Sequence, residues 1–167
     1  MKSQCLALLL SLTTLTAWAG NEGPQAAPTL PSQVLAEMVI GSGFGPPDMP
    51  FSTTIDIMKD GRVQEIQTFR MNRTVITELA TLAPDTLAKL NKTVQSTKKG
   101  NIVDPDPKVP SCMDAPTTMY FAILNSGERI ELGASEGCKE MRKDNATYGD
   151  KQIQKILQGF MSLIYLN

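Results

Sequence analysis

The side chains that could do chemistry in this chain are mainly carboxylates and thiols, because the sequence contains no histidine. Histidine is the commonest general base near neutral pH and the commonest metal ligand, so its absence excludes Ser-His-Asp and Cys-His catalysis. Seventeen acidic residues remain, and a histidine-free hydrolase that uses paired carboxylates stays an alternative. No carboxylate pair is marked by its spacing, so we find no catalytic constellation, predict a non-catalytic protein and expect no cofactor.

The densest group of carboxylates is also the only candidate for metal binding. It consists of Asp104, Asp106 and Asp114, and proline follows each of the first two. Two or three carboxylates can bind Ca²⁺ weakly. Prolines also stiffen an exposed turn, which explains the segment without an ion. We therefore predict no metal site and take these three aspartates as part of a candidate binding loop.

The thiols are Cys5, Cys112 and Cys138. Cys5 lies in a segment that we expect to be removed, which leaves an even pair. In an oxidising compartment such a pair is expected to form a disulfide. The Cys112–Cys138 bridge would close a loop of about 27 residues, worth roughly 3–4 kcal/mol in the chain-entropy model. A redox-active pair is the alternative, but the spacing is not C-x-x-C.

The first part of the chain has the pattern of a secretory signal peptide. Lys2 precedes an apolar stretch that runs from Leu6 to Leu15, and Ala17-Trp18-Ala19 matches a cleavage site. We expect residues 1–19 to be removed. The protein would then be exported, as a soluble periplasmic or extracellular protein without a transmembrane segment.

Two further regions follow the signal peptide. Residues 20–32 are rich in Gly, Pro and Ala and are expected to form a disordered leader, and residues 33–167 are expected to form a single domain. Without Lys2 the chain has 15 basic and 17 acidic residues. That balance gives no electrostatic reason to expect nucleic-acid binding.

A second candidate binding loop lies between residues 41 and 50. It contains Gly43, Phe44, Gly45 and Asp48. A phosphate-binding loop must open into a helix and usually supplies a lysine, whereas here prolines follow and no lysine is near. We expect an exposed loop that can contact a partner.

Alternating apolar residues predict two hairpins. Strands over 51–58 and 63–69 flank Asp60-Gly61, and strands over 117–124 and 128–132 flank Asn125-Ser126-Gly127. Asp-Gly is a strong hairpin signal. A third strand is possible over 74–79. For residues 33–40, periodicity does not separate strand from helix.

Two helices are predicted beside these hairpins. The first begins near Pro84 and ends before Gly100, and the last follows Asp150 as a possible N-cap. The charged run 138–144 is expected to be a solvated surface. The elements together predict an α+β domain, with an antiparallel sheet built from two hairpins and two helices packed on one face.

The order of these elements is similar to that of small secreted bacterial proteins of unknown function. A Gly-Phe-Gly entry, a Lys-Asp-Gly-Arg hairpin, a Leu-Ala-Pro-Asp-Thr-Leu-Ala-Lys-Leu helix, a second hairpin and a terminal helix follow one another between Gly43 and Leu163. The same order resembles the emfourin family of metalloprotease inhibitors, at the level of pattern. The resemblance implies an inhibitor-like module that binds a protein partner in the cell envelope or outside the cell. A structural envelope protein remains a further alternative.

Overall fold

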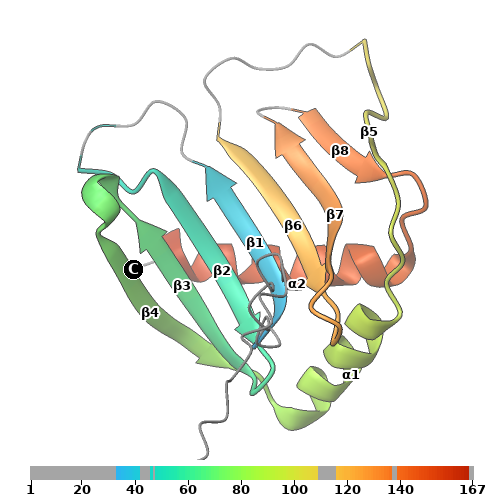
Figure 1. Ribbon diagram of the computed structural model, residues 1–167, viewed down its shortest axis with the longest axis horizontal. Coiled ribbons are helices and arrows are strands. Elements are labelled where there is room, and N and C mark those ends of the chain that lie inside the picture. The colour runs from blue at the N-terminus through green and yellow to red at the C-terminus, as the bar shows by residue number, and fades with distance from the viewer. Residues whose placement is uncertain (1–32, 42–45, 47, 109–115, 137–138, 166–167) are drawn as a thin grey trace, which may run out of the picture. The chain divides into compact units, whose positions relative to one another are not determined.

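The computed structural model describes residues 33–41, 46, 48–108, 116–136 and 139–165. Eight strands form one sheet in the order β4-β3-β2-β1-β6-β7-β8-β5, and all neighbours are antiparallel (Figure 1). The elements are β1 (Val34–Gly41), β2 (Ser52–Met58), β3 (Arg62–Thr68), the short 3-10 helix η1 (Arg70–Asn72), β4 (Thr74–Thr81), α1 (Pro84–Gln95), β5 (Ile102–Val103), β6 (Thr117–Ile123), β7 (Arg129–Glu136), β8 (Lys139–Lys143) and α2 (Tyr148–Tyr165).

The α+β prediction of a sheet made from two hairpins is wrong, because the described residues form a mainly β structure with a single eight-stranded sheet. The apolar run that periodicity left undecided is β1, and it pairs with β2 on one side and β6 on the other. The run expected to be a solvated surface contains β8. Two of its lysines are satisfied by ion pairs, Lys139 with Asp104 and Lys143 with Asp150, which allows charged residues to lie in a paired strand.

The sheet consists of two halves that meet at β1 and β6. In each half the chain runs outward from the centre, through β1, β2, β3 and β4 or through β6, β7 and β8, and then enters a helix. The pairing of Met38 with Tyr120 lies in the middle of the joint. The two-residue strand β5 lies outside β8 and completes the second edge.

Both helices contribute to one hydrophobic core. Figure 1 shows α2 running across one face of the sheet, while α1 packs against α2 and the ends of β1 and β6. The first helix begins at Pro84, as its Leu-Ala-Pro-Asp start predicts. The fully buried side chains of the core come from strands and helices alike: Leu35, Ala36, Met38, Ile55, Ile57, Val63, Val94, Ala122, Leu132, Ile153 and Leu157.

A buried ion pair ties α2 to the edge of the sheet. Lys143 Nζ lies 2.9 Å from Asp150 Oδ2, and both side chains are fully buried. Lys143 Nζ also donates to the carbonyl oxygen of Lys98, and Thr97 Oγ1 donates to Asp150 Oδ1. The pair therefore joins β8, the end of α1 and the start of α2.

Asp150 also helps to start α2, although it is not the N-cap residue. The residue before the helix is Thr147. Its backbone N–H donates to Asp150 Oδ2 at 2.8 Å, and the N–H of Asp150 donates to Thr147 Oγ1 at 3.1 Å, as in a capping box. Burial opposes ionisation of Asp150. The hydrogen bonds from Lys143 and Thr147 outweigh it and hold the pKa of Asp150 below its ordinary value.

We predict that Lys143→Met lowers the free energy of unfolding by about 3–5 kcal/mol, because it leaves the charge of Asp150 buried without a partner. Denaturation in urea at neutral pH measures the loss, and Lys155→Met on the exposed side of α2 is the control. Because the pKa of Asp150 is lowered, the pair contributes at neutral pH and its contribution is lost only as the pH falls below 3.8. A loss below about 1 kcal/mol would contradict the structural role of this pair.

Candidate functional site

The structure describes only some of the residues that the sequence singled out. Gly43, Phe44, Gly45 and Asp114 lie outside the described residues, as do both members of the predicted disulfide, Cys112 and Cys138. Asp48 is exposed in the connection between β1 and β2. Asp104 and Asp106 follow β5 directly.

The two described aspartates of the Asp104 segment are engaged in local structure. The backbone N–H of Asp106 donates to Asp104 Oδ1 at 2.9 Å, and that of Lys108 donates to Asp106 Oδ1 at 3.3 Å. Lys139 pairs with Asp104, and this hydrogen bond holds the pKa of Asp104 below its ordinary value. Within the part of the chain that the structure describes, no three potential metal ligands lie together.

The first candidate binding loop begins, and the second ends, at neighbouring strand ends. Gly41, where the first loop leaves β1, pairs with Thr117, where the second loop enters β6. Asp104 and Asp106 of the second loop instead follow β5, at the outer edge of the sheet.

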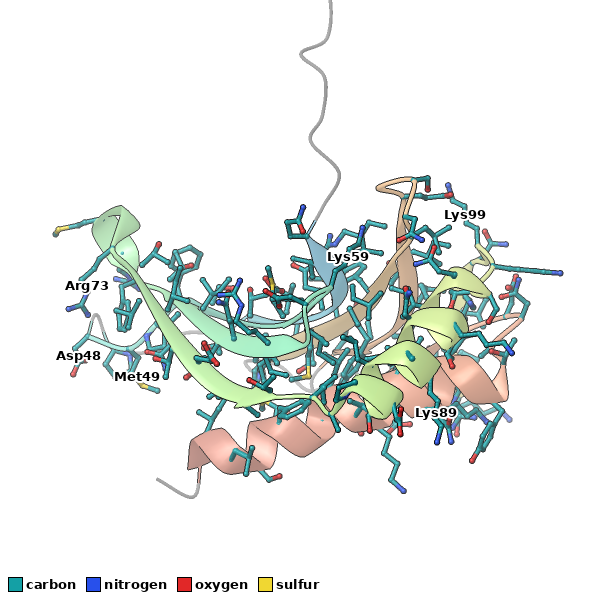
Figure 2. The ribbon with its side chains drawn as sticks, turned by 90° about the horizontal axis from the view of Figure 1, so that it is seen from below. Asp48, Met49, Lys59, Arg73, Lys89 and Lys99 are labelled. Atoms are coloured by element: carbon teal, nitrogen blue, oxygen red, sulfur yellow. The ribbon has the colours of Figure 1, made fainter. Side chains whose placement is uncertain are left out.

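A site that the sequence did not predict lies on the face of the sheet opposite α2. Figure 2 shows the sheet curving away from the helices, so that this face is concave; Lys89 points out on the helix side and Lys59 on the other side. Within the described residues, no helix covers this face, which we call the open face. Its floor is formed by the side chains that alternate with the core residues of each strand.

One row of paired residues crosses the middle of the open face. Asp56 of β2 pairs with Glu37 of β1, Glu37 with Phe121 of β6, and Phe121 with Glu131 of β7. Residues paired directly across neighbouring strands lie about 4.5–5.5 Å apart at their Cβ atoms. The row therefore brings three carboxylates and an aromatic ring together on one surface.

Arg129 lies across this row. Its Nε donates to Glu37 Oε2 at 2.7 Å, and its guanidinium carbon lies 3.4 Å from the centre of the Phe121 ring. The guanidinium thus has a carboxylate partner and an aromatic face at once, an arrangement that favours arginine over lysine. We call Glu37, Asp56, Phe121, Arg129 and Glu131 the central cluster.

Asp56 is the unusual member of the central cluster. Only 8% of the residue is exposed, and its Oδ1 has no hydrogen-bond partner among the described residues. Its pKa is raised to about 6, mainly by burial and also by the charge of Glu37, while Arg129 acts to lower it. Burial also raises the pKa of Glu131, with Arg129 lowering it and Glu136 raising it. The open face therefore holds carboxylates that are not balanced by the single arginine at their centre.

The row of the open face next to the central cluster is mainly apolar. Ile76, Ile66, Thr54, Val39 and Met119 pair in that order across β4, β3, β2, β1 and β6. Ile76 at the β4 edge is 62% exposed. An antiparallel sheet with one solvated face usually presents mainly polar residues there, and this row departs from that pattern.

A separate polar hollow of about 420 Å³ lies on the helix side, between α2 and the strands β6, β7 and β8. Gln154 and Gln158 line it, but their amide groups already donate to Leu132 O and to the Tyr120 hydroxyl. Its polar groups are thus partly used in holding α2 to the sheet.

The central cluster was missed because its members are far apart in sequence. Asp56 lies between Ile55 and Ile57, and alternation alone places it on the face opposite the core. The sequence therefore indicated a carboxylate on the face opposite the core. The partners of Asp56 on β1 and β7 depend on strand order, which local periodicity does not specify.

No model of a known protein family matches the chain, and no curated protein matches it. Among the described residues, no helix has both the length and the apolar character needed to cross a membrane.

We predict that Asp56→Asn raises the free energy of unfolding by about 1–2 kcal/mol at pH 7.5. A carboxyl with a raised pKa favours the folded state when protonated, so its ionisation weakens the fold as the pH rises from about 4 through 6. The difference in the free energy of unfolding between Asp56→Asn and the native protein should shrink toward pH 4, where Asp56 is protonated. Urea denaturation across this range measures it, with the exposed Asp85→Asn as control. Destabilisation at pH 7.5 would show that the Asp56 carboxylate is well paired.

Proposed function

We propose that this chain is an exported, non-catalytic binding protein that contacts a protein partner, in the cell envelope or outside the cell, through the open face of its sheet. One observation carries the proposal: the face that no described helix covers bears an apolar row and a half-buried charged cluster. Exposed apolar surface rimmed by polar residues is typical of protein interfaces. Phe121 and Arg129 at its centre are of the residue types enriched in interface cores.

Export is supported by the start of the sequence. Lys2, the apolar stretch up to Leu15 and the Ala17–Ala19 site form a complete secretory pattern. An oxidising destination agrees with an even pair of cysteines in the processed chain.

The resemblance to the emfourin family suggests a different binding surface for the partner, the two loops of an inhibitor-like module. Its support is the attachment of the segments after Gly41 and before Thr117 at adjacent strand ends. Two loops at one end of a rigid sheet could enter a partner's cleft together, and a rigid scaffold lowers the entropic cost of such binding.

A histidine-free hydrolase is the second candidate, favoured by one observation. Asp56 has a pKa near 6 and lies beside Glu37, which is the pattern of an acid–base carboxylate pair. Against it, Asp56 is almost completely covered and Glu37 is held by Arg129. A substrate would have to displace that ion pair to reach either group, so we favour binding.

We predict that a photo-cross-linking residue at Ile76, on the open face, forms a covalent adduct with the partner in cells that produce the protein. The same residue at Lys89, on the exposed side of α1, is the matched control and should give none. Gel mobility and mass spectrometry of the adducts measure the outcome. Adducts from Lys89 only, or none from either position, would contradict the proposal.

We predict that the exported protein begins at Gly20 and contains no free thiol. Intact-mass analysis checks processing after Ala19, and Ellman titration of the denatured, unreduced protein checks the Cys112–Cys138 disulfide. Two titratable thiols would contradict the bridge, and a chain that retains residues 1–19 would contradict export by a cleaved signal.

A further inference from the structure

We infer that the open face receives a cationic segment of a protein partner, with a lysine or arginine side chain seated over Glu37 and Asp56 of the central cluster. This inference rests on the proposed function and specifies the chemistry of the partner. It is carried by the charge distribution of the two faces and by an unpartnered carboxylate oxygen at the floor of the open one.

The two sides of the molecule differ in charge, although the chain as a whole is nearly neutral. The exposed charges of α1 and α2 are four lysines, Lys89, Lys92, Lys151 and Lys155, and one acid, Asp85. The open face carries the three carboxylates of the central cluster, with Glu78 and Glu136 on neighbouring positions of β4 and β7. Of the basic residues on this side, Arg62 pairs with Asp60, Lys139 with Asp104 and Arg129 with Glu37. Lys59 and Lys99 lie on the same side, and the five carboxylates still outnumber Arg129 and these two lysines. Complementary charge thus favours a cationic partner on this face.

The second observation concerns Asp56. Its Oδ1 is buried and has no hydrogen-bond partner among the described residues. Alternation along β2 places the side chain on the open face, beside Glu37. A buried acceptor without a hydrogen bond is costly. A lysine or arginine of the partner would donate a hydrogen bond to this oxygen. It would also add positive charge beside the carboxylates of the central cluster, in which Arg129 is the single cation.

There is room for such a side chain beside the cluster. A hollow of about 570 Å³ lies between the segment that leads into β5 and strand β7, and it is lined in part by Lys99, Asn101, Phe121, Arg129 and Glu131. The side chain of Arg129 is 46% exposed, so its guanidinium can shift toward Glu131 and leave Glu37 and Asp56 to the incoming cation. The three carboxylates would then have two cationic partners in place of one.

The inference can be tested with the purified processed protein and a defined probe. The probe is a fluorescein-labelled peptide of alternating lysine and threonine, and its partner control is the same peptide with glutamate in place of lysine. Fluorescence anisotropy measures binding at low and at physiological salt. We expect the lysine peptide to bind, its Kd to weaken about tenfold as the salt is raised, and the glutamate peptide not to bind.

Variants locate the binding. Glu37→Gln and Asp56→Asn should each weaken binding of the lysine peptide at least fivefold. Glu140→Gln removes the same charge from an exposed position that alternation places on the other side of β8, and should change the Kd less than twofold. Circular dichroism confirms that each variant is folded. Equal losses from Glu140→Gln, or no loss from either cluster variant, would overturn the inference.

The pH dependence gives an independent readout. The charged groups that act on Asp56 are Glu37 from β1 and Arg129 from β7, and the residue paired with Asp56 on β3 is the neutral Gln64. Because Asp56 loses its proton near pH 6, binding should tighten from pH 5 to 7.5 in the native protein. It should tighten less in Asp56→Asn. An equal pH effect in both proteins would contradict a role for Asp56.

The inference and the proposed function fail separately. If Ile76 gives a partner adduct but the lysine peptide does not bind, the open face is the interface and its partner is not cationic. If the peptide binds the cluster but adducts form only at Lys89, the cationic site is real and the proposed partner surface is wrong.

Discussion

The pairing of β1 with β6 is the constraint on which the rest of the structure depends. It joins two halves that each run outward from the centre and each end in a helix, and it makes one continuous eight-stranded sheet. Two helices then have only one sheet to pack on. Because α1 and α2 contact each other and share one core, they cover a single face. The opposite face is left open within the described residues, and this consequence of topology provides the surface that we propose as the interface.

The helix side and the open face of the structure carry different sets of charged residues. On the covered side, the lysines of α1 and α2 point to solvent, and the fully buried Lys143–Asp150 pair holds the end of the sheet to the helices. On the open side, Glu37 and Asp56 lie on adjacent strands, and Arg129 pairs with Glu37. A net charge near zero therefore conceals a separation of charge, which the composition alone does not reveal. That separation gives a binding surface selectivity for the sign of its partner's charge.

Local sequence signals predicted the local elements and failed for the sheet as a whole. Alternation located the hairpin at Asp60-Gly61, and Pro84 marked the start of the first helix, because both signals act over a few residues. The number of strands was underestimated for two reasons. β1 pairs with β6, which is distant in sequence, and β8 is a charged run whose lysines, Lys139 and Lys143, are satisfied by Asp104 and Asp150. The central cluster escaped prediction for the same reason, since it exists only through the register of β2, β1, β6 and β7.

Carboxyl footprinting tests the central claim, that the open face is covered by a partner where the protein works. Carbodiimide-mediated labelling is applied to the protein in its native compartment and to the purified protein, and mass spectrometry compares each carboxyl group. We expect Glu37 and Glu131 to be labelled less in the native compartment, while Asp85 on α1 and Glu140 on β8 are labelled equally in both. Protection of Asp85 with unchanged labelling of Glu37 would contradict the account.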